Sequence, residues 1–463
     1  MLLAVRRPAR DWFAIAALPG AAAAACIFTA ASMYAAFIGW PFVGLSLVIA
    51  GVLVVVTLSR PPVGVGAAVV LFGLSPLGLT GSPAWLLPTA WSAFVFGLAL
   101  TGAGDREGGR TALPRLAVLV IALLMVAMVS AAASNHAGDA IPIVRPVLAG
   151  LMLFVAATTF VRGRDDVACV LAGVTTTAII VGGFTVWEYV SGAAGDTGFL
   201  TTTGAVVTRV SAGFGSPNQL AGFLVLLLPG VVAGMVLAPR GRLVGAAAIV
   251  LTVAGVYVTF SRGALIALVV IPLFFIPLRW SLLLVPVAAA LLLLSGPALL
   301  KERFGTLSED GSEVATRADF WRAGVTMFGQ HPLAGVGPGG FPEAYSESRL
   351  PGKQFLPGTL FKPPPHAHNL LINTAAEQGL LGLGALIAAL VSATQMAGRL
   401  RRRSVPWVRL LGRAYLAMLA AFMVHNLFDV TLLEATMTVF LGLLGLLSAV
   451  AAIDAAAEAP AGV

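Results

Sequence analysis

The chain has 463 residues; 59% of them are hydrophobic, only 10% are charged, and the formal net charge is +8. Soluble domains carry about 25% charged residues, so this composition excludes a water-soluble globular protein. The excess positive charge is spread over short connections between apolar segments, where basic residues determine the orientation of a membrane protein. We therefore do not interpret it as a nucleic-acid-binding surface and expect no nucleic-acid partner.

Apolar runs of about twenty residues recur along the chain, and each can cross about 30 Å of hydrocarbon as a helix. Helices are expected because they satisfy their own backbone hydrogen bonds where water is absent. We predict an all-α polytopic integral membrane protein with about 12–14 transmembrane helices, the lower number applying if some short pairs are re-entrant. The runs lie near 12–34, 39–59, 62–80, 84–101, 114–133, 141–161, 167–190, 218–238, 243–260, 263–278, 281–300, 368–396, 408–428 and 432–453.

One long hydrophilic segment, residues 301–367, interrupts this series between the spans near 281–300 and 368–396. It holds seven basic and seven acidic residues. A loop of this length is usually functional, and its balanced charge suits a small folded cap better than a disordered tail. We therefore expect three regions: transmembrane helices over 1–300, a large extracytoplasmic loop domain over 301–367, and transmembrane helices over 368–463.

The basic residues divide unequally between the two sides of the predicted membrane. If the N-terminus is cytoplasmic, 18 of the 28 basic residues fall in connections on the cytoplasmic side. Positive charge collects on that side in membrane proteins, so we predict that both termini are cytoplasmic and that 301–367 lie outside. The 18 are Arg6, Arg7, Arg10, Arg60, Arg106, Arg110, Arg115, Arg162, Arg164, Arg240, Arg242, Arg279, Arg399, Arg401, Arg402, Arg403, Arg409 and Arg413.

Three arginines break this pattern because they occupy the short outer connections or the span ends beside them: Arg145, Arg209 and Arg262. An arginine near hydrocarbon is costly unless it meets an anion or a wet cavity, so each is a candidate functional residue. Arg209 precedes a span in TRVSAGFGSPNQLAG, and Arg262 separates two apolar runs in TFSRGAL. Snorkelling or helix capping is the alternative, and it explains Arg145 in PIVRPVL particularly well.

A second group of candidates follows the long loop, in PPPHAHNLLINTAAEQGLLGLG. The prolines end any earlier helix, so a new helix should begin near His366 or His368 at the membrane surface. The free N–H groups at such a helix start also favour an anion. Asn369, Asn373 and Glu377 follow at intervals of four and share one face of this helix, with Glu377 inside the membrane.

A third candidate group is HNLFD, in which His425 and Asp429 stand at helical spacing. It is either a functional pair or a local pair that stabilises the end of a span. The GVGPGG sequence at 335–340 lacks the strand and the acidic partner of a dinucleotide-binding fold, so we interpret it as a tight turn. The five histidines and two cysteines show no metal-ligand spacing, and we expect no metal and no other cofactor.

Four of these stretches, in this order, resemble the O-antigen ligase family within the O-antigen ligase and polymerase superfamily. They are RVSAGFGSPNQLA at 209–221, FSRGA around Arg262, TRADFWRAGVTMFGQHPLAGVGPGGF at 316–341, and the helix start at His368 with Glu377-Gln-Gly inside it. The third stretch contains an Arg-x-x-x-Trp pattern from Arg317, followed by Pro-x-x-Gly-x-Gly. The resemblance spans roughly 205–435, whereas the N-terminal third matches only as a series of spans.

The resemblance implies a glycosyltransferase of the bacterial inner membrane that acts on the outer face, with inversion and without a metal. Its donor would be a glycan on undecaprenyl diphosphate, its acceptor a hydroxyl group of a lipid core or another glycan, and its surroundings membrane lipids. By this resemblance Arg209 and Arg262 would bind the diphosphate and His368 would be catalytic. From its position alone, Glu377 is a further catalytic candidate that could orient or polarise His368, and the sequence leaves open whether the two touch. The additional candidates are Arg145, Arg317, His366, Asn369, His425 and Asp429.

The chemistry of these residues agrees with that implication. A departing diphosphate needs preorganised cationic donors, and the planar guanidinium group grips phosphate oxygens in a bidentate manner. A sugar hydroxyl is a poor nucleophile that needs a positioned base, and histidine suits this task. A ligase is the leading prediction. The alternatives are a polymerase of the same superfamily, a protein O-oligosaccharyltransferase, and a non-enzymatic lipid or polysaccharide transporter, which would favour ionisable residues near the bilayer midplane.

Overall fold

The computed structural model describes residues 51–78, 85–102, 115–134, 140–193, 198–200, 206–277, 279–280, 313–347 and 365–458. The predicted spans near 12–34 and 281–300, and most of the span near 39–59, lie outside the described residues.

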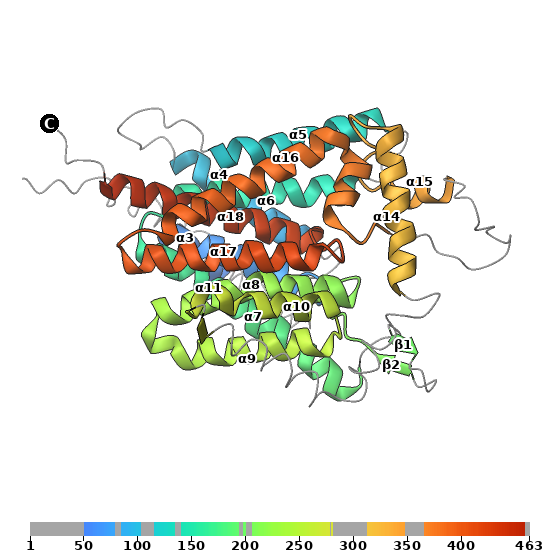
Figure 1. Cartoon of the computed structure of the whole chain (residues 1–463). Helices are drawn as coiled ribbons and strands as arrows, with labels where there is room; N and C mark the ends of the chain where they lie inside the picture. The colour runs from blue at the N-terminus through green and yellow to red at the C-terminus, as the bar shows by residue number, and fades with distance from the viewer. Residues whose placement is uncertain are drawn as a thin grey trace, which may run out of the picture.

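The described part is a bundle of helices whose order follows the predicted spans (Figure 1). Eight of the described helices are long and apolar enough to cross a membrane, which confirms the prediction of an all-α polytopic membrane protein. They are α5 (Arg115–Ala133), α6 (Ile141–Phe160), α7 (Arg164–Ser191), α8 (Pro217–Leu237), α9 (Arg242–Val258, extended by the 3-10 turn Pro239–Gly241), α16 (Leu370–Arg401), α17 (Pro406–Asn426) and α18 (Glu434–Glu458).

Shorter apolar helices complete the bundle: α3 (Pro61–Leu74), α4 (Leu86–Gly102), α10 (Arg262–Val270) and α11 (Pro272–Phe275). Residues 313–347 of the long loop form α14 (Glu313–Gln330) and α15 (Phe341–Glu347). Within the described residues the strands are limited to a small antiparallel hairpin of β1 (Gly198–Leu200) and β2 (Val206–Thr208), in which Phe199 pairs with Val207.

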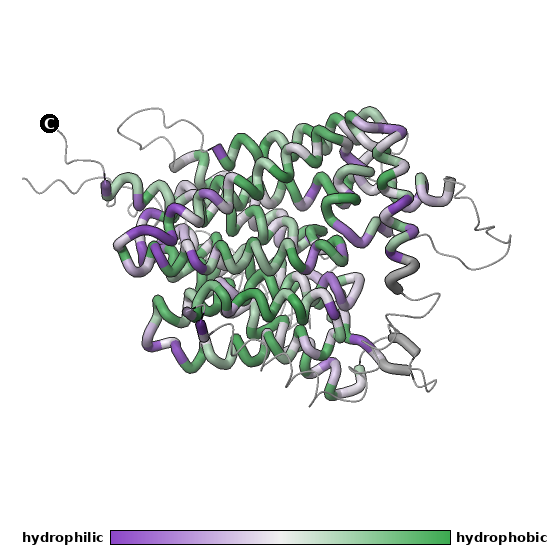
Figure 2. The backbone as a smooth tube through the Cα atoms, in the orientation of Figure 1, coloured by the Kyte–Doolittle hydropathy of each residue, from purple (hydrophilic) through white to green (hydrophobic). Residues whose placement is uncertain are grey.

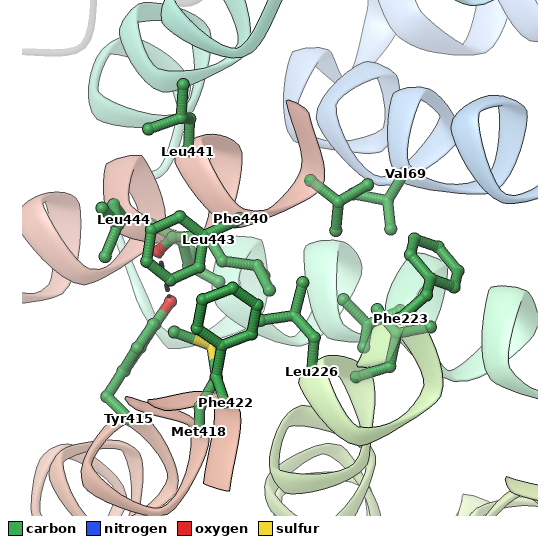
Figure 3. Packing of buried hydrophobic residues seen from close by; sticks show 14 of the residues in the cluster. Val69, Phe223, Leu226, Tyr415, Met418, Phe422, Phe440, Leu441, Leu443 and Leu444 are labelled. Atoms are coloured by element: carbon green, nitrogen blue, oxygen red, sulfur yellow. Dashed lines mark hydrogen bonds between the residues drawn. The ribbon is translucent and has the colours of Figure 1, made fainter. Parts of the chain in front are cut away.

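The centre of the bundle is α18, which packs along α6 over most of its length. Small residues permit this close approach: a Cβ atom added to Gly445 would lie 2.6 Å from the Cα atom of Phe154. Figure 3 shows the adjoining core, where the rings of Phe422 and Phe440 stack with centroids 5.0 Å apart. The Tyr415 hydroxyl donates a 2.7 Å hydrogen bond to a backbone carbonyl of α18, so its polar atom is satisfied inside the apolar core.

The two ends of the bundle are formed by different segments. Helices α14 and α15 and the β-hairpin lie at one end, which we call the α14 end (Figure 1). The connections α6–α7, α8–α9 and α16–α17 lie at the opposite end, and hydrophilic residues gather at both ends of the apolar bundle (Figure 2). These connections carry arginines that the sequence assigns to one side, including Arg162, Arg240 and Arg402. The alternation of the chain therefore follows the predicted order, and which end faces the cytoplasm stays a prediction.

Helix α16 is broken near the α14 end, and a loop segment fills the break. Gly379 has φ 62° and ψ −158°, outside the helical region. The segment 331–340 lies against it: the N–H groups of Val336 and Gly337 donate to the carbonyls of Ala376 and Glu377, both at 2.9 Å. On the other side of the break, the Leu380 N–H group donates to the Pro332 carbonyl at 2.8 Å. The 335–340 stretch, which we expected to form a tight turn, belongs to this segment. The segment thus provides hydrogen-bond partners for backbone groups at the break in a membrane helix.

Candidate active site

The N-terminus of α16 positions the central histidine. Asn369 is the N-cap residue: its Oδ1 atom accepts hydrogen bonds from the N–H groups of Leu371 and Ile372 at 3.0 and 3.1 Å. Its Nδ2 atom donates to the Leu427 carbonyl at 3.1 Å, which ties this helix start to the end of α17. The helix begins at Leu370, two residues after His368, close to the predicted start.

His368 lies immediately before this cap in a left-handed conformation, with φ 52°. Positive φ is uncommon for a non-glycine residue and is often found where function fixes a side chain. The ring of His368 stacks on Phe320 of α14, with centroids 5.6 Å apart. About 23% of its side chain stays exposed, so the ring is held from one side and reachable from another.

Asp429 is the charged partner of His368. Its Oδ1 atom lies 3.1 Å from Nδ1 of His368 and 3.7 Å from Nε2 of His366. The Val430 N–H group donates to the same oxygen at 2.7 Å, and the Asn218 side chain donates to Oδ2. Asp429 is buried, with 2% of its surface exposed, yet its carboxylate has partners on both oxygens.

The electrostatics of the Asp429 carboxylate favour its ionised form. Burial raises the pKa of Asp429, but the hydrogen bond from His368 and the neighbouring His366 and His425 together hold this pKa well below its usual range. Burial lowers the pKa of His366 to about 4, despite the opposing effect of the Asp429 charge. His366 is therefore neutral near pH 7, and Asp429 is an anion there.

Arg209 connects to Asp429 through a single residue, Asn218. The Nε atom of Arg209 donates to the Thr259 carbonyl at 2.8 Å, and its guanidinium group donates to Oδ1 of Asn218 at 2.8 Å. Since the amide of Asn218 also donates to Asp429, a continuous chain of polar contacts joins Arg209 to His368. Asn218 was not among the candidate residues predicted from the sequence; it appeared there only as part of the 209–221 motif. Its position in the first turn of α8, where a polar amide follows the N-cap residue, could have indicated a role.

Three guanidinium groups and Asp429 line one cavity. Arg209 precedes α8, Arg262 is the first residue of α10, and Arg317 lies on α14. Residues more than 50 positions apart in sequence thus meet at the α14 end of the bundle, which the predicted topology permits for Arg209 and Arg262. The cavity is lined by Arg209, Asn218, Phe260, Ser261, Arg262, Gly263, Arg317, His425, Phe428 and Asp429. We call it the arginine cavity.

His425 faces the arginine cavity from the last turn of α17. Its Nε2 atom lies 3.4 Å from the Ser261 hydroxyl, and its Nδ1 atom is buried without a hydrogen-bond partner among the described residues. Helix α17 ends at Asn426, whose Oδ1 atom accepts from the N–H and hydroxyl groups of Thr431. Asp429 therefore lies beyond the end of α17, and His425 and Asp429 are not one turn apart on the same helix as their spacing suggested.

Glu377 lies on the buried face of α16 with Asn373, as the spacing predicts, but the structure does not place it beside His368. Its carboxylate accepts hydrogen bonds from the backbone N–H groups of Gly339 and Phe341 and from the Asn373 side chain. These contacts hold the 331–340 segment on the broken helix. The partner of His368 is Asp429, which lies 61 residues later in the sequence.

Arg145 lies outside the arginine cavity. Its guanidinium group lies over the ring of Trp85, 4.7 Å from the centroid, and forms an ion pair with Glu434 at 3.5 Å. Both partners line a different, larger cavity.

Among the residues that the structure describes, His366, His368 and Asp429 form a group that could hold a metal ion. They offer one ligand atom each, and these atoms lie within 4.8 Å of one another. This group is not apparent from residue spacing, because Asp429 belongs to the connection between α17 and α18, 61 residues after His368. The expectation that no metal takes part stays a prediction.

A family model described as O-antigen ligase matches residues 245–387. The match runs from α9 to the first half of α16 and contains Arg262, Arg317, His368 and Glu377. No curated protein sequence matches the chain. The chain is thus a multi-pass membrane protein in which residues 245–387 match the model of the O-antigen ligase family.

Proposed function

We propose that this protein is an inverting glycosyltransferase of O-antigen ligase type. It moves a glycan from undecaprenyl diphosphate to a hydroxyl group of an acceptor glycan at the outer face of the bacterial inner membrane. The observation that carries the proposal is the chain of contacts from His368 through Asp429 and Asn218 to Arg209. It joins a candidate base to a candidate diphosphate site in one partly buried place.

The role of His368 follows from its contact with Asp429. An ionised carboxylate only accepts hydrogen bonds, so the 3.1 Å contact assigns the proton of the neutral ring to Nδ1 of His368. The lone pair of the neutral ring is then on Nε2, which can take a proton from an acceptor hydroxyl. The Asp429 charge stabilises the imidazolium ion that results.

The arginines serve the other half of the reaction. When the bond between the sugar C1 and the phosphate oxygen breaks, negative charge grows on the diphosphate. Arg209, Arg262 and Arg317 direct their positive charge into the same cavity, where they offset that growth. Arg209 is already oriented by the Thr259 carbonyl and by Asn218, so little reorganisation is needed.

The reaction step balances in the following way. The acceptor oxygen attacks C1 of the donor sugar and forms the new glycosidic bond, while the C1–O bond to the diphosphate breaks. The electron pair of the broken bond leaves with the diphosphate, and the hydroxyl proton passes to Nε2 of His368. His368 returns this proton to solvent or to the released diphosphate. Attack on the face of C1 opposite the diphosphate inverts its configuration.

The experiment is a competition among acceptors. The purified protein receives a carrier-linked glycan together with lipid-core, carrier-linked and protein acceptors, and the acceptor that gains mass is identified. Gain on the lipid core supports the ligase. If the carrier-linked glycan gains mass, the protein is a polymerase rather than a ligase. If a protein acceptor gains mass, it is a protein O-oligosaccharyltransferase. If no acceptor gains mass while the glycan crosses a membrane, a transporter replaces the transferase.

A further inference from the structure

A second cavity of about 490 Å³ lies at the α14 end of the bundle, between α3, α4, α6, α8 and α18. It shares no lining residue with the arginine cavity, yet the two are adjacent. Asn218 lines the arginine cavity and the next residue, Gln219, lines this one. The connection before α18 likewise contributes Asp429 to the first and Leu433 to the second. We call it the Trp85 cavity.

The Trp85 cavity is nearly neutral, and most of its lining residues are apolar. Its described charged groups are Arg145 and Glu434, which form an ion pair at 3.5 Å. The arginine cavity is lined by three arginines and one carboxylate, so its net positive charge suits a diphosphate. The Trp85 cavity has no such excess of positive charge, so its composition disfavours a second phosphate group. A few hydrogen-bonding side chains on a largely apolar wall suit an uncharged ligand that has both apolar and polar surface.

Its side chains match the two kinds of surface on a sugar ring. Trp85 is 39% exposed, and although Arg145 lies over its ring, the indole adds aromatic surface that can contact the C–H side of a sugar ring. Arg145, Glu434 and Gln219 offer donors and acceptors to the hydroxyl groups around it. The side chain of Glu434 is 66% exposed, so the carboxylate can bind a ligand while its ion pair with Arg145 stays in place. A cavity of this volume is large enough for more than one sugar residue.

Backbone strain connects the two cavities. Among the described residues, four that are not glycine have positive φ: Ala212, Phe260, His368 and Glu434. Phe260 lines the arginine cavity and His368 contacts its Asp429, whereas Glu434 lines the Trp85 cavity and Ala212 directly precedes Gly213 in its wall. Such conformations persist where the surrounding structure holds a residue for a purpose. Both cavities therefore have strained backbone positions in or next to their walls, as functional sites often do.

We propose that the Trp85 cavity binds the uncharged sugar residues of a glycan chain whose reacting end lies at His368. The proposal rests on the proposed function and adds to it a chain-binding subsite beside the reaction centre. The chain belongs to the donor or to the acceptor; in both cases the ligand is a neutral oligosaccharide. A subsite of this kind makes the enzyme prefer long chains over single sugars.

The test compares substrates of different length. Undecaprenyl-diphosphate donors bearing one sugar or several repeat units, and acceptors of one sugar or several, are offered to the full-length protein. The acceptor class is the one identified by the competition experiment. The variants are Trp85→Ala, Glu434→Gln and Thr89→Trp, the last of which places bulk in the cavity from α4 without removing a charged contact. Trp187→Ala removes a 55% exposed tryptophan that lines neither cavity and is the matched control.

We expect each cavity variant to lower the ratio of kcat/KM for long over short chains by about tenfold, with the change mainly in KM for one substrate. The Trp187→Ala protein should keep the native ratio. If the KM for donor chains rises, the cavity binds the donor glycan; if the KM for acceptor chains rises, it binds the acceptor glycan. Unchanged ratios in all three variants overturn the proposal, while loss of transfer in the His368→Ala protein still upholds the proposed function. Normal transfer by the His368→Ala protein overturns the mechanism instead.

Discussion

The Nδ1 atom of His368 lies 3.1 Å from Oδ1 of Asp429, a residue 61 positions later in the chain. The contact joins the residue before the N-cap of α16 to the connection between α17 and α18. It orients the imidazole ring and places a buried negative charge beside it. Asn218 links the same carboxylate to Arg209, so the pair is connected to the arginine cavity.

Replacing His368 by alanine should abolish transfer while donor binding survives, since the substitution removes the base and leaves the arginines. General-base catalysis contributes about 10² to 10⁴ in rate, so a loss in this range is expected. Asp429→Asn should also slow turnover strongly because the imidazolium ion loses its counter-charge. His366→Ala should have a smaller effect. Turnover and binding of carrier-linked glycan are measured on equal amounts of membrane protein; normal turnover of the His368→Ala protein would exclude the residue from the mechanism.

Arg209→Ala and Arg262→Ala should each cost on the order of 3 kcal/mol of transition-state stabilisation, or about a hundredfold in rate. Arg209→Lys and Arg262→Lys should also be strongly impaired because a point charge loses the bidentate grip on phosphate oxygens. Turnover is measured with and without EDTA, and the native protein should keep its activity in the chelator. Active lysine variants would contradict bidentate recognition. Inhibition by EDTA would show that a metal contributes, with His366, His368 and Asp429 as its candidate ligands.

Acid should destabilise the fold through His366. The pKa of this residue falls from its ordinary 6.5 to about 4 on folding because the ring is buried. As the pH falls from 6.5 towards 4, the unfolded chain takes up a proton that the folded chain refuses, so the free energy of unfolding decreases by up to about 1.4 kcal/mol per pH unit. The pKa of Asp429 is also lowered, but its contribution is lost only below the ordinary range of a carboxyl group.

The measurement for this pH effect is thermal unfolding of the purified protein in detergent at pH 7 and pH 5. The native protein should lose more Tm between the two values than the His366→Gln protein, whose amide does not titrate. Equal losses in the two proteins would show that His366 is not the responsible group.

Gly335→Ala should release the 331–340 segment from α16. Gly335 has φ +70°, and an added Cβ atom would lie 2.2 Å from the carbonyl carbon of Glu377. The strained backbone alone costs about 1–3 kcal/mol. We expect a lower Tm, faster proteolysis within 331–340 and lower turnover. The control is Gly329→Ala on α14, where an added Cβ atom meets nothing within 4 Å; a matching loss there would contradict the assignment to docking.

Cysteines at Ser346 and Ser404 should label from opposite sides of the membrane. Ser346 lies on α15 at the α14 end, and Ser404 lies in the α16–α17 connection at the other end. In a background without Cys26 and Cys169, an impermeant thiol reagent should modify Ser346→Cys in intact cells. Ser404→Cys should react only after the membrane is opened. Labelling of both positions in intact cells would refute the predicted orientation.

The sequence by itself determined the membrane class, the order of the spans and the residues worth testing. A transmembrane helix is a local property, because length and hydrophobicity within one segment decide it. The described spans therefore lie where the apolar runs predicted them, and the helix after the prolines begins at Leu370, beside His368. Arg209 and Arg262 stood out for a similar reason, since an arginine in an apolar neighbourhood is costly wherever it occurs.

Only the tertiary structure decided which side chains are partners. Helical spacing suggested that Glu377 could orient His368, but the sequence left open whether the two residues touch. The structure pairs His368 with Asp429 and ties Glu377 to the backbone at Gly339 and Phe341. Asn218 reaches Asp429 across 211 residues of sequence. Such contacts depend on which helices pack together and on where each helix ends, and both are set by many weak interactions spread over the whole bundle rather than by the residues that meet.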